Sequence, residues 1–204
     1  MDDEGGLVPQ KFYKNLIYNV VELMFLIAHD DPEVQKYRTT FQTHDGTKVL
    51  YRPIHPDDDD KILEFYYSLS RETIYFRFFS GRKNVPTSRI RDYTHIDYQK
   101  NFAMVVEFQN QIVGIGHYII TDNPETAEMA VVMHDDWQRK GIGTHFLKYI
   151  IVIAKERGVK YITATVLLEN YKIMKTIEKI GFKFSKKLEE GDLLVEADIS
   201  NFQM

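Results

Sequence analysis

A mixed α/β fold, with one central sheet flanked by helices, is predicted for this chain of 204 residues. Two observations predict it. Segments of strand character alternate with amphipathic helical segments from residue 48 onward, in the order strand, helices, three strands, helix, strand, helix, two strands. Two glycines, Gly141 and Gly143, lie where one strand meets the longest helix. The chain is therefore expected to form one α/β domain without internal repeats.

The composition is typical of a soluble globular protein, with 44% hydrophobic and 27% charged residues. No apolar run is long enough to span a bilayer, so we expect no membrane association and a cytoplasmic protein. The formal net charge of -4 argues against a nucleic-acid-binding protein, because such proteins use clustered Lys and Arg to neutralise phosphates. The absence of cysteine excludes disulfides, thiolate metal sites and cysteine nucleophiles.

The first 45 residues are predicted to lie outside the main domain. Residues 1–10 are acidic and glycine-rich and are expected to form a disordered tail, followed by an N-terminal helical appendage over 11–45. Residues 46–204 are the predicted domain. In the appendage, apolar residues at steps of three and four predict an amphipathic helix that ends before Asp30-Asp31-Pro32. These apolar residues are Phe12, Leu16, Val20, Leu23 and Ile27.

The first half of the domain is predicted to contain a strand followed by helices. The strand, over 48–54, is rich in β-forming residues. The acidic run 57–60 directly precedes a helical apolar pattern. We interpret this run as a helix start rather than a metal site, because acidic side chains favour the positive end of a helix dipole. A second helix follows over 70–79, with Ser70 as its N-cap, and a third over 88–93.

The second half is predicted to contain a β-hairpin and two helices that alternate with strands. The hairpin turns tightly at residues 109–111. Gly158 and Gly181 close the two helices, at the C-terminal position where glycine is favoured. The predicted strands are 102–108, 112–121, 127–133, 161–167, 182–185 and 193–198, and the predicted helices are 142–157 and 171–180.

The segment Gln138-Arg139-Lys140-Gly141-Ile142-Gly143 carries the clearest chemistry. Small residues at a strand-to-helix turn allow main-chain N–H groups to point at one centre, and the helix N terminus favours anions. Arg139 and Lys140 would add charge-assisted contacts to phosphate oxygens. The spacing is neither that of a P-loop nor that of a dinucleotide-binding loop. The sequence therefore predicts a pyrophosphate-binding loop, with a helix cap that binds no ligand as the alternative.

This loop resembles the acetyl-CoA motif of the GNAT superfamily of N-acetyltransferases, Gln/Arg-x-x-Gly-x-Gly/Ala. The resemblance continues through Glu169-Asn170 and Lys179-Ile180-Gly181-Phe182 and covers roughly residues 49–199. It implies a GNAT fold, with a central mixed sheet of six to seven strands flanked by about four helices. It also implies that acetyl-CoA is the cosubstrate, with pantetheine lying between two splayed strands. The implied cosubstrate-binding residues are Val131, Val132, Met133, Gln138, Arg139, Lys140, Gly141, Ile142, Gly143, Thr144 and Asn170.

Four further segments resemble bacterial protein lysine acetyltransferases. They are Tyr51 to Asp58, Tyr75 to Phe79, Ile96 to Tyr98 and Ala127 to Val132. This resemblance implies a transferase that moves an acetyl group to a protein lysine. Two alternatives stay open, an acetyltransferase for small amines and a non-catalytic module that senses acyl-CoA.

The acceptor amine must lose a proton before it attacks, because a free lysine has a pKa of about 10.4. By resemblance to lysine acetyltransferases, Glu128 on the strand before the loop is the candidate general base. The alternative is that Glu128 is a charge at a strand edge. His134 and Asp135 are the substitutes, and both are expected to belong to the connecting loop. The developing oxyanion would meet a main-chain N–H in the 131–133 strand.

The residue type that often serves as general acid in this family is replaced in this chain. Many family members have a tyrosine four residues before the Gly-Phe pair, where this chain has Ile177. Tyr171 is the nearest replacement. Asn170, also named as a catalytic candidate, would either cap the following helix or contact CoA or its bridging water.

Three other features complete the expectations. Trp137 is expected to pack behind the loop. His95 and His117 have no partners at metal-ligand spacing, so no metal is assigned. Residues 23–30, with Ile27-Ala28-His29, resemble the end of acetyl-CoA hydrolase and CoA-transferase chains. This resemblance implies fusion to a larger acyl-CoA enzyme or a helix that docks on a dimer mate, while packing on its own domain is the simpler alternative.

Overall fold

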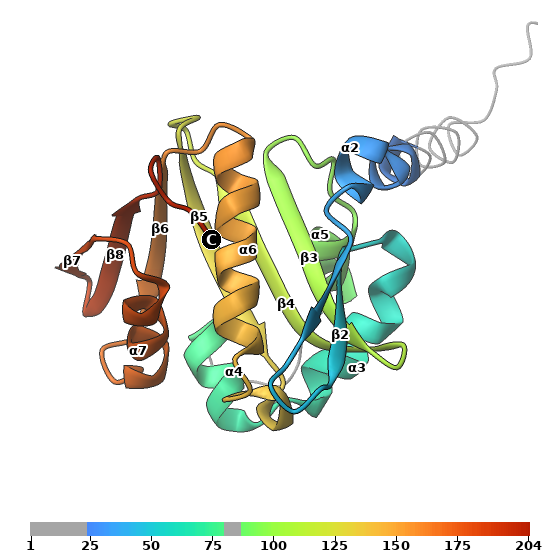
Figure 1. Ribbon diagram of the computed structural model, residues 1–204, viewed down its shortest axis with the longest axis horizontal. Helices are drawn as coiled ribbons and strands as arrows, with labels where there is room; N and C mark the ends of the chain where they lie inside the picture. Colours follow the sequence, from blue (N-terminus) through green and yellow to red (C-terminus); the bar gives the residue numbers. More distant parts are fainter. Residues whose placement is uncertain (1–23, 80–86) are drawn as a thin grey trace, which may run out of the picture.

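The computed structural model describes residues 24–79 and 87–204 of the chain (Figure 1). The expected tail over 1–10 and most of the expected N-terminal helix lie outside the described residues. Within them, residues 24–30 are helical, so the helix includes Asp30 and ends one residue later than predicted. Asp31 then caps a short helix α2 (Pro32–Gln35), because its side chain accepts from the main-chain N–H of Glu33 at 2.9 Å.

An eight-stranded mixed sheet forms the centre of the domain, with strand order β1-β2-β3-β4-β5-β6-β8-β7. Neighbouring strands are antiparallel except β5 and β6, which are parallel. The predicted fold class is confirmed. The strands are β1 (Thr39–Gln42), β2 (Lys48–Pro53), β3 (Asn101–Phe108), β4 (Gln111–Ile120), β5 (Thr126–Met133), β6 (Tyr161–Val166), β7 (Phe184–Glu189) and β8 (Asp192–Asp198).

The sheet has one strand more than the upper count expected from sequence. Strand β1 pairs with β2 through Thr39 opposite Tyr51, and it lies in the segment that was expected to be helical. Its four residues are too few to show an alternating pattern, so only the pairing reveals it. Strand β7 also begins at Phe184, two residues later than predicted.

The helices cover both faces of the sheet. On β4, a Cβ at Gly116 would lie 2.3 Å from Ile150 Cδ1 and 2.9 Å from Phe146, so this side of the strand faces α6. Side chains alternate along a strand, so His117 and Ile119 face the opposite side, against which α3 packs. Figure 1 shows α6 crossing one face of the sheet. The helices are α3 (Asp59–Ser68), α4 (Arg71–Phe78), α5 (Thr87–Thr94), α6 (Ile142–Glu156) and α7 (Tyr171–Ile180), with 3-10 turns η1 (Pro56–Asp58) and η2 (Asp135–Trp137).

The acidic run 57–60 begins a helix, as predicted, and one of its members is buried in an ion-pair network. Arg52 donates two hydrogen bonds to Asp58 at 2.7 and 2.8 Å and two to Glu107 at 2.7 and 2.9 Å. Burial raises the pKa of Asp58, but the hydrogen bonds and charge of Arg52 outweigh it and the pKa is lowered. This network fastens the start of α3 to β2 and β3.

Large side chains on both faces of the sheet make up the hydrophobic core. Phe146 and Ile150 from α6 are fully buried against one face, and Leu69 and Ile74 from the α3–α4 region are fully buried in the same continuous cluster. Across the described ranges, no helix combines the length and apolarity needed to cross a membrane.

Candidate active site

Strands β5 and β6 pair over three residues and then separate. Their register pairs are Thr126 with Tyr161, Ala127 with Ile162 and Glu128 with Thr163. Beyond Glu128, β5 stays paired with β4 as far as Met133, while β6 stays paired with β8. The two strands therefore diverge, and the main-chain groups of β5 on the β6 side are left without a strand partner.

A cavity of about 820 Å³ occupies this divergence. Its walls include the free edges of β5 and β6, α4 residues from one face of the sheet, and α6 and α7 residues from the other. The cavity therefore runs through the sheet rather than lying on one face. This shape suits an elongated ligand that enters from one face and meets a second substrate from the other.

The loop before α6 presents main-chain N–H groups to one end of the cavity. Gly141 is the N-cap of α6 with φ of 81°, and no side chain caps this 15-residue helix. The N–H groups of the first turn have no acceptor within the helix. Arg139 also has positive φ, 63°, and lines the cavity with Gly141. Main-chain N–H groups in this arrangement can bind an anion, which is the property that the predicted pyrophosphate-binding loop requires.

Gly143 has no side chain and so leaves the start of α6 accessible from the cavity. A Cβ at this position would lie 3.2 Å from Met133 Cγ at the end of β5. A larger side chain would therefore fill space between the helix start and the strand. The side chain of Ile142, in contrast, is fully buried in the core, so only the main chain of Ile142 can serve a ligand.

Gln138 fastens this loop to two other elements. Its Nε2 donates to the main-chain oxygen of Met133 at 3.1 Å and lies 3.2 Å from the Thr73 hydroxyl oxygen. Asp135 accepts from the Ser70 N–H at 2.9 Å, the Ser70 hydroxyl at 2.7 Å and the Thr73 hydroxyl at 2.7 Å. Partial burial raises the pKa of Asp135, but these hydrogen bonds lower it overall. The loop is thus held by the start of α4.

The two substitute bases belong to this connecting loop, as expected. Asp135 is occupied by Ser70 and Thr73, and Ser70 caps α4 by accepting from the Thr73 N–H at 3.1 Å. His134 Nδ1 accepts from the Asp136 N–H at 3.2 Å and caps η2. Neither side chain is free to take a proton from an amine without losing a structural contact.

Nine of the eleven predicted cosubstrate-binding residues line the cavity, and two do not. Lys140 lies outside it, with its Nζ 4.8 Å from the Trp137 ring centroid, and Ile142 is the other exception. Trp137 packs against Phe108 at a centroid distance of 4.7 Å, behind the loop as expected. The nine lining residues are Val131, Val132, Met133, Gln138, Arg139, Gly141, Gly143, Thr144 and Asn170.

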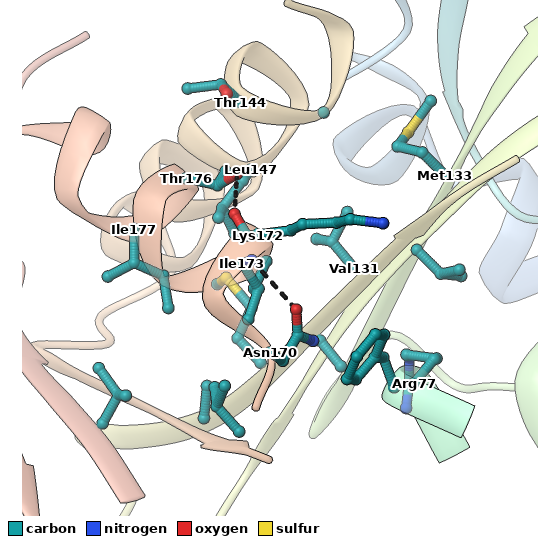
Figure 2. Close-up of a pocket in the computed structure, with 18 of the residues that line it drawn as sticks. Arg77, Val131, Met133, Thr144, Leu147, Asn170, Lys172, Ile173, Thr176 and Ile177 are labelled. Carbon is teal, nitrogen blue, oxygen red and sulfur yellow. Dashed lines mark hydrogen bonds between the residues drawn. The ribbon is translucent and has the colours of Figure 1, made fainter. Parts of the chain in front are cut away.

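Glu128 lies where the strands diverge, and it lines the cavity as an exposed side chain. It is directly opposite Ile119 on β4, so it shares the α4 side of the sheet with His117. A neighbour of Glu128 that the sequence did not identify is Arg77 of α4. Arg77 also lines the cavity (Figure 2). Arg77 Nε is buried and has no hydrogen-bond partner among the described residues.

Burial and the neighbouring side chains have opposite effects on the pKa of Arg77. Burial lowers the pKa of Arg77, and the nearby Tyr93 and Glu128 partly offset the lowering. His117 is affected in turn, because burial and then the charge of Arg77 lower its pKa to about 3. The one signal in the sequence was the position of this arginine in the segment Tyr75 to Phe79, which resembles lysine acetyltransferases.

Asn170 caps α7, one of the two alternatives left open. Its Oδ1 accepts from the Ile173 N–H at 3.2 Å, and the residue lines the cavity (Figure 2). Ile177 also lines the cavity and is buried with Met174. Tyr171 is 71% exposed and is not among the lining residues, so it does not replace the missing tyrosine. Among the described residues, no group of three or more His, Asp or Glu side chains could hold a metal ion.

The cavity thus passes through the sheet, with the uncapped start of α6 at one end and the Glu128 carboxylate where β5 and β6 diverge. The chain belongs to the GNAT family of acetyltransferases, whose family model matches residues 64–182.

Two curated relatives carry acetyltransferase names. Acetyltransferase Pat of Mycolicibacterium smegmatis is 30% identical over 167 residues, which are 78% of this chain and 48% of that protein. An acetyltransferase of Pseudomonas aeruginosa is 29% identical over 120 residues, which are 57% of this chain and 64% of that protein. The chain thus spans about half of the first relative and under two thirds of the second. Among solved structures, the GNAT domain of S. lividans PAT superposes with a TM-score of 0.76 at 25% identity, covering 80% of this chain and 97% of that one.

Proposed function

We propose that this chain is an acetyl-CoA-dependent N-acetyltransferase that transfers the acetyl group by direct attack of an amine, with a protein lysine as the acceptor. The observation that carries the proposal is the cavity between β5 and β6, which ends at the uncapped start of α6. It has a volume of about 820 Å³, is lined by residues from both faces of the sheet, and would hold a pantetheine arm with the pyrophosphate at the start of α6.

The residues present fit acetyl-CoA on several independent grounds. The N–H groups at the start of α6 and the Arg139 side chain would hold the pyrophosphate, and the gap at Gly143 leaves room for it. The unpaired edge of β5 at residues 131–133 would hydrogen-bond the pantetheine amides, which need donors and acceptors of this kind. Bound acetyl-CoA would supply a thioester carbonyl carbon for the amine and a CoA thiolate as the leaving group.

Glu128 is the proposed general base. It lies at the divergence of the strands, on the face opposite α6, where an amine would meet the acetyl group. Its carboxylate would accept a proton from the acceptor ammonium, directly or through one water. The charge of Arg77 beside it would disfavour a second cation and so help the amine to lose its proton. A main-chain N–H of residues 131–133 would then stabilise the oxyanion.

No side chain is assigned as general acid. Ile177 fills the position of the usual tyrosine and Tyr171 lies away from the cavity. Because a thiolate is an acceptable leaving group near neutral pH, the reaction can proceed with water as the proton donor. Catalysis would then depend on the general base Glu128 and not on a side chain that acts as general acid.

The protein acceptor is supported by the four segments that resemble lysine acetyltransferases. Incubation with cell extract and acetyl-CoA, followed by mass spectrometry of acetylated lysines, tests it. The expected result is a set of acetylated lysines that disappears with Glu128→Gln. Transfer to polyamines or aminoglycosides without protein acetylation would instead support a small-amine enzyme. Tight binding of acetyl-CoA without transfer to any amine would contradict catalysis and support a sensor.

A further inference from the structure

Arg77 is a buried cation on the wall of the cavity whose hydrogen-bonding capacity is not fully used. Its Nε is buried and has no hydrogen-bond partner in the part of the chain that the structure describes, and the residue lines the cavity (Figure 2). Tyr93 and Glu128 raise the pKa of Arg77, but burial lowers it by more. An unsatisfied buried donor is costly, and an anion that enters the cavity would satisfy it.

Two neighbours on the sheet locate Arg77 relative to β5. The charge of Arg77 acts on Glu128 of β5 and on His117 of β4. His117 is the cross-strand partner of Ala130. Side chains alternate along a strand, so Glu128 and Ala130 both face α4. Arg77 therefore lies over the segment of β5 from Glu128 to Ala130.

This segment of β5 is where the proposed reaction would take place. Glu128 is the proposed base, and the main-chain N–H groups of residues 131–133 are the proposed oxyanion donors. The reacting acyl carbon would therefore lie beside Ala130, which also lines the cavity and has only a methyl group as its side chain. The rest of the acyl group, beyond this carbon, would extend into the part of the cavity that Arg77 lines.

An acetyl group does not satisfy Arg77. Its methyl group has neither a charge nor a hydrogen-bond acceptor, so it offers nothing to the buried Nε. A succinyl group has the same thioester and ends in a carboxylate. This carboxylate has two acceptor oxygens, which match the planar fork of guanidinium donors, and its negative charge would offset the cost of burying the cation. The chemistry of Arg77 thus fits an acyl group with a carboxylate end.

We infer that this site also transfers dicarboxylic acyl groups such as succinyl, and that Arg77 binds their free carboxylate. This second activity rests on the proposed function, because it uses the same cavity, base and leaving group. The ammonium proton goes to Glu128, the amine nitrogen forms a C–N bond with the thioester carbon, and the C–S bond breaks to release the CoA thiolate. The distal carboxylate stays on Arg77 during transfer and remains unchanged in the product amide.

Calorimetric titration of acyl-CoA without an amine tests the carboxylate subsite. Succinyl-CoA is compared with succinamoyl-CoA, in which a neutral amide of similar size replaces the carboxylate. The unaltered protein should bind succinyl-CoA about 10- to 150-fold more tightly, the range for a hydrogen bond to a charged group. Arg77→Met should remove this preference, and Arg77→Lys should keep part of it, because an ammonium keeps the charge but not the planar fork. The matched control is Arg71→Met, an exposed arginine of α4 that is not among the lining residues, which should keep the preference.

Equal affinity of the unaltered protein for the two compounds would overturn the inference without the need for a variant, and so would an undiminished preference in Arg77→Met. Transfer to a lysine peptide gives a second readout, the ratio of kcat/KM for succinyl-CoA to kcat/KM for acetyl-CoA. This ratio should fall in Arg77→Met, whereas an equal fall in both rates would mean that Arg77 serves only Glu128. Failure of the proposed function is a separate result, seen when the unaltered protein prefers succinyl-CoA in binding yet transfers neither acyl group to any amine.

Discussion

Glu128 on β5 and Thr163 on β6 are the last register pair before these two parallel strands separate. The proposed base therefore stands at the point where the cavity opens. The residues of β5 that follow it contribute their free main-chain edge to the cavity wall. One departure from regular pairing thus creates both the edge proposed to bind pantetheine and the position of the proposed base.

The loop at the start of α6 is tested by Gly143→Val. A Cβ at Gly143 would lie 3.2 Å from Met133 Cγ, and a branched side chain would also enter the anion site. Because charged hydrogen bonds contribute about 1.5–3 kcal/mol each, loss of one should weaken acetyl-CoA binding by about 10- to 150-fold. Calorimetric titration measures this. Gly143→Ala should give a smaller loss, and unchanged affinity in Gly143→Val would refute the assigned binding site.

The base is tested by Glu128→Gln, which keeps the shape of the side chain and removes its charge. General base catalysis contributes about 10²- to 10⁴-fold, so kcat/KM for transfer to lysine should fall by that factor. Acetyl-CoA affinity should stay within about twofold, since the anion site is at the other end of the cavity. Glu64→Gln, an exposed carboxylate on α3, is the control. If Glu128→Gln transferred acetyl groups at the original rate, water alone would be the base.

The parts of this fold that were predictable from sequence are those set by neighbouring residues. Helix α7 begins and ends where its periodicity and Gly181 place it, and Ser70 caps α4 as its side chain suggests. The β3–β4 hairpin follows from its turn, in which Gln109 and Asn110 both have positive φ. Residues close together in the sequence determine these helix ends, caps and turns, so they can be predicted from the sequence alone.

The features that escaped prediction depend on contacts distant in sequence. Arg77 approaches Glu128 only because α4 packs on β5, and Lys172 meets Glu72 across the cavity although 100 residues separate them. The role of Asp135 as an acceptor for the start of α4 also requires the folded loop. No periodicity or spacing reports such contacts, so the candidate base was identifiable while its surroundings were not.

The link between α4 and the binding loop is tested by Asp135→Asn. The amide keeps one acceptor oxygen but loses the charge that Ser70 and Thr73 hydrogen-bond. Unfolding free energy should fall by about 1–2 kcal/mol, as for a weakened cap with charged acceptors. The Thr73 hydroxyl donates to Asp135 and accepts from Gln138 of the binding loop. A change at Asp135 should therefore also disturb this loop and lower the affinity for acetyl-CoA. Urea denaturation measures the stability, and calorimetric titration measures the affinity. A loss of stability with unaltered affinity would show that the contacts of Asp135 with α4 do not affect acetyl-CoA binding.

The buried network around Arg52 is tested by Arg52→Met. Removal of the guanidinium leaves Asp58 and Glu107 without their shared cation, in surroundings that are largely closed to water. Breaking a buried pair in this way costs about 3–5 kcal/mol of unfolding free energy. Lys36→Met, which breaks the exposed pair with Glu33, should leave the unfolding free energy almost unchanged. A loss for Arg52→Met as small as that of the control would contradict a structural role for the network.

Acid sensitivity of the fold is tested at His117, the buried neighbour of Arg77. Its pKa is lowered from 6.5 to about 3, first by burial and then by the charge of Arg77. The unfolded chain therefore binds a proton below pH 6.5 that the folded chain binds only near pH 3, so stability falls as the pH falls through this window. Between pH 7 and pH 5 this one group should reduce the unfolding free energy by about 2 kcal/mol. Urea denaturation at both pH values should show that His117→Gln removes this part of the acid sensitivity. His44→Gln, in the exposed turn between β1 and β2, controls for loss of a surface imidazole. An equal pH response in the original protein and in His117→Gln would mean that His117 gains its proton in the folded state as readily as in the unfolded one.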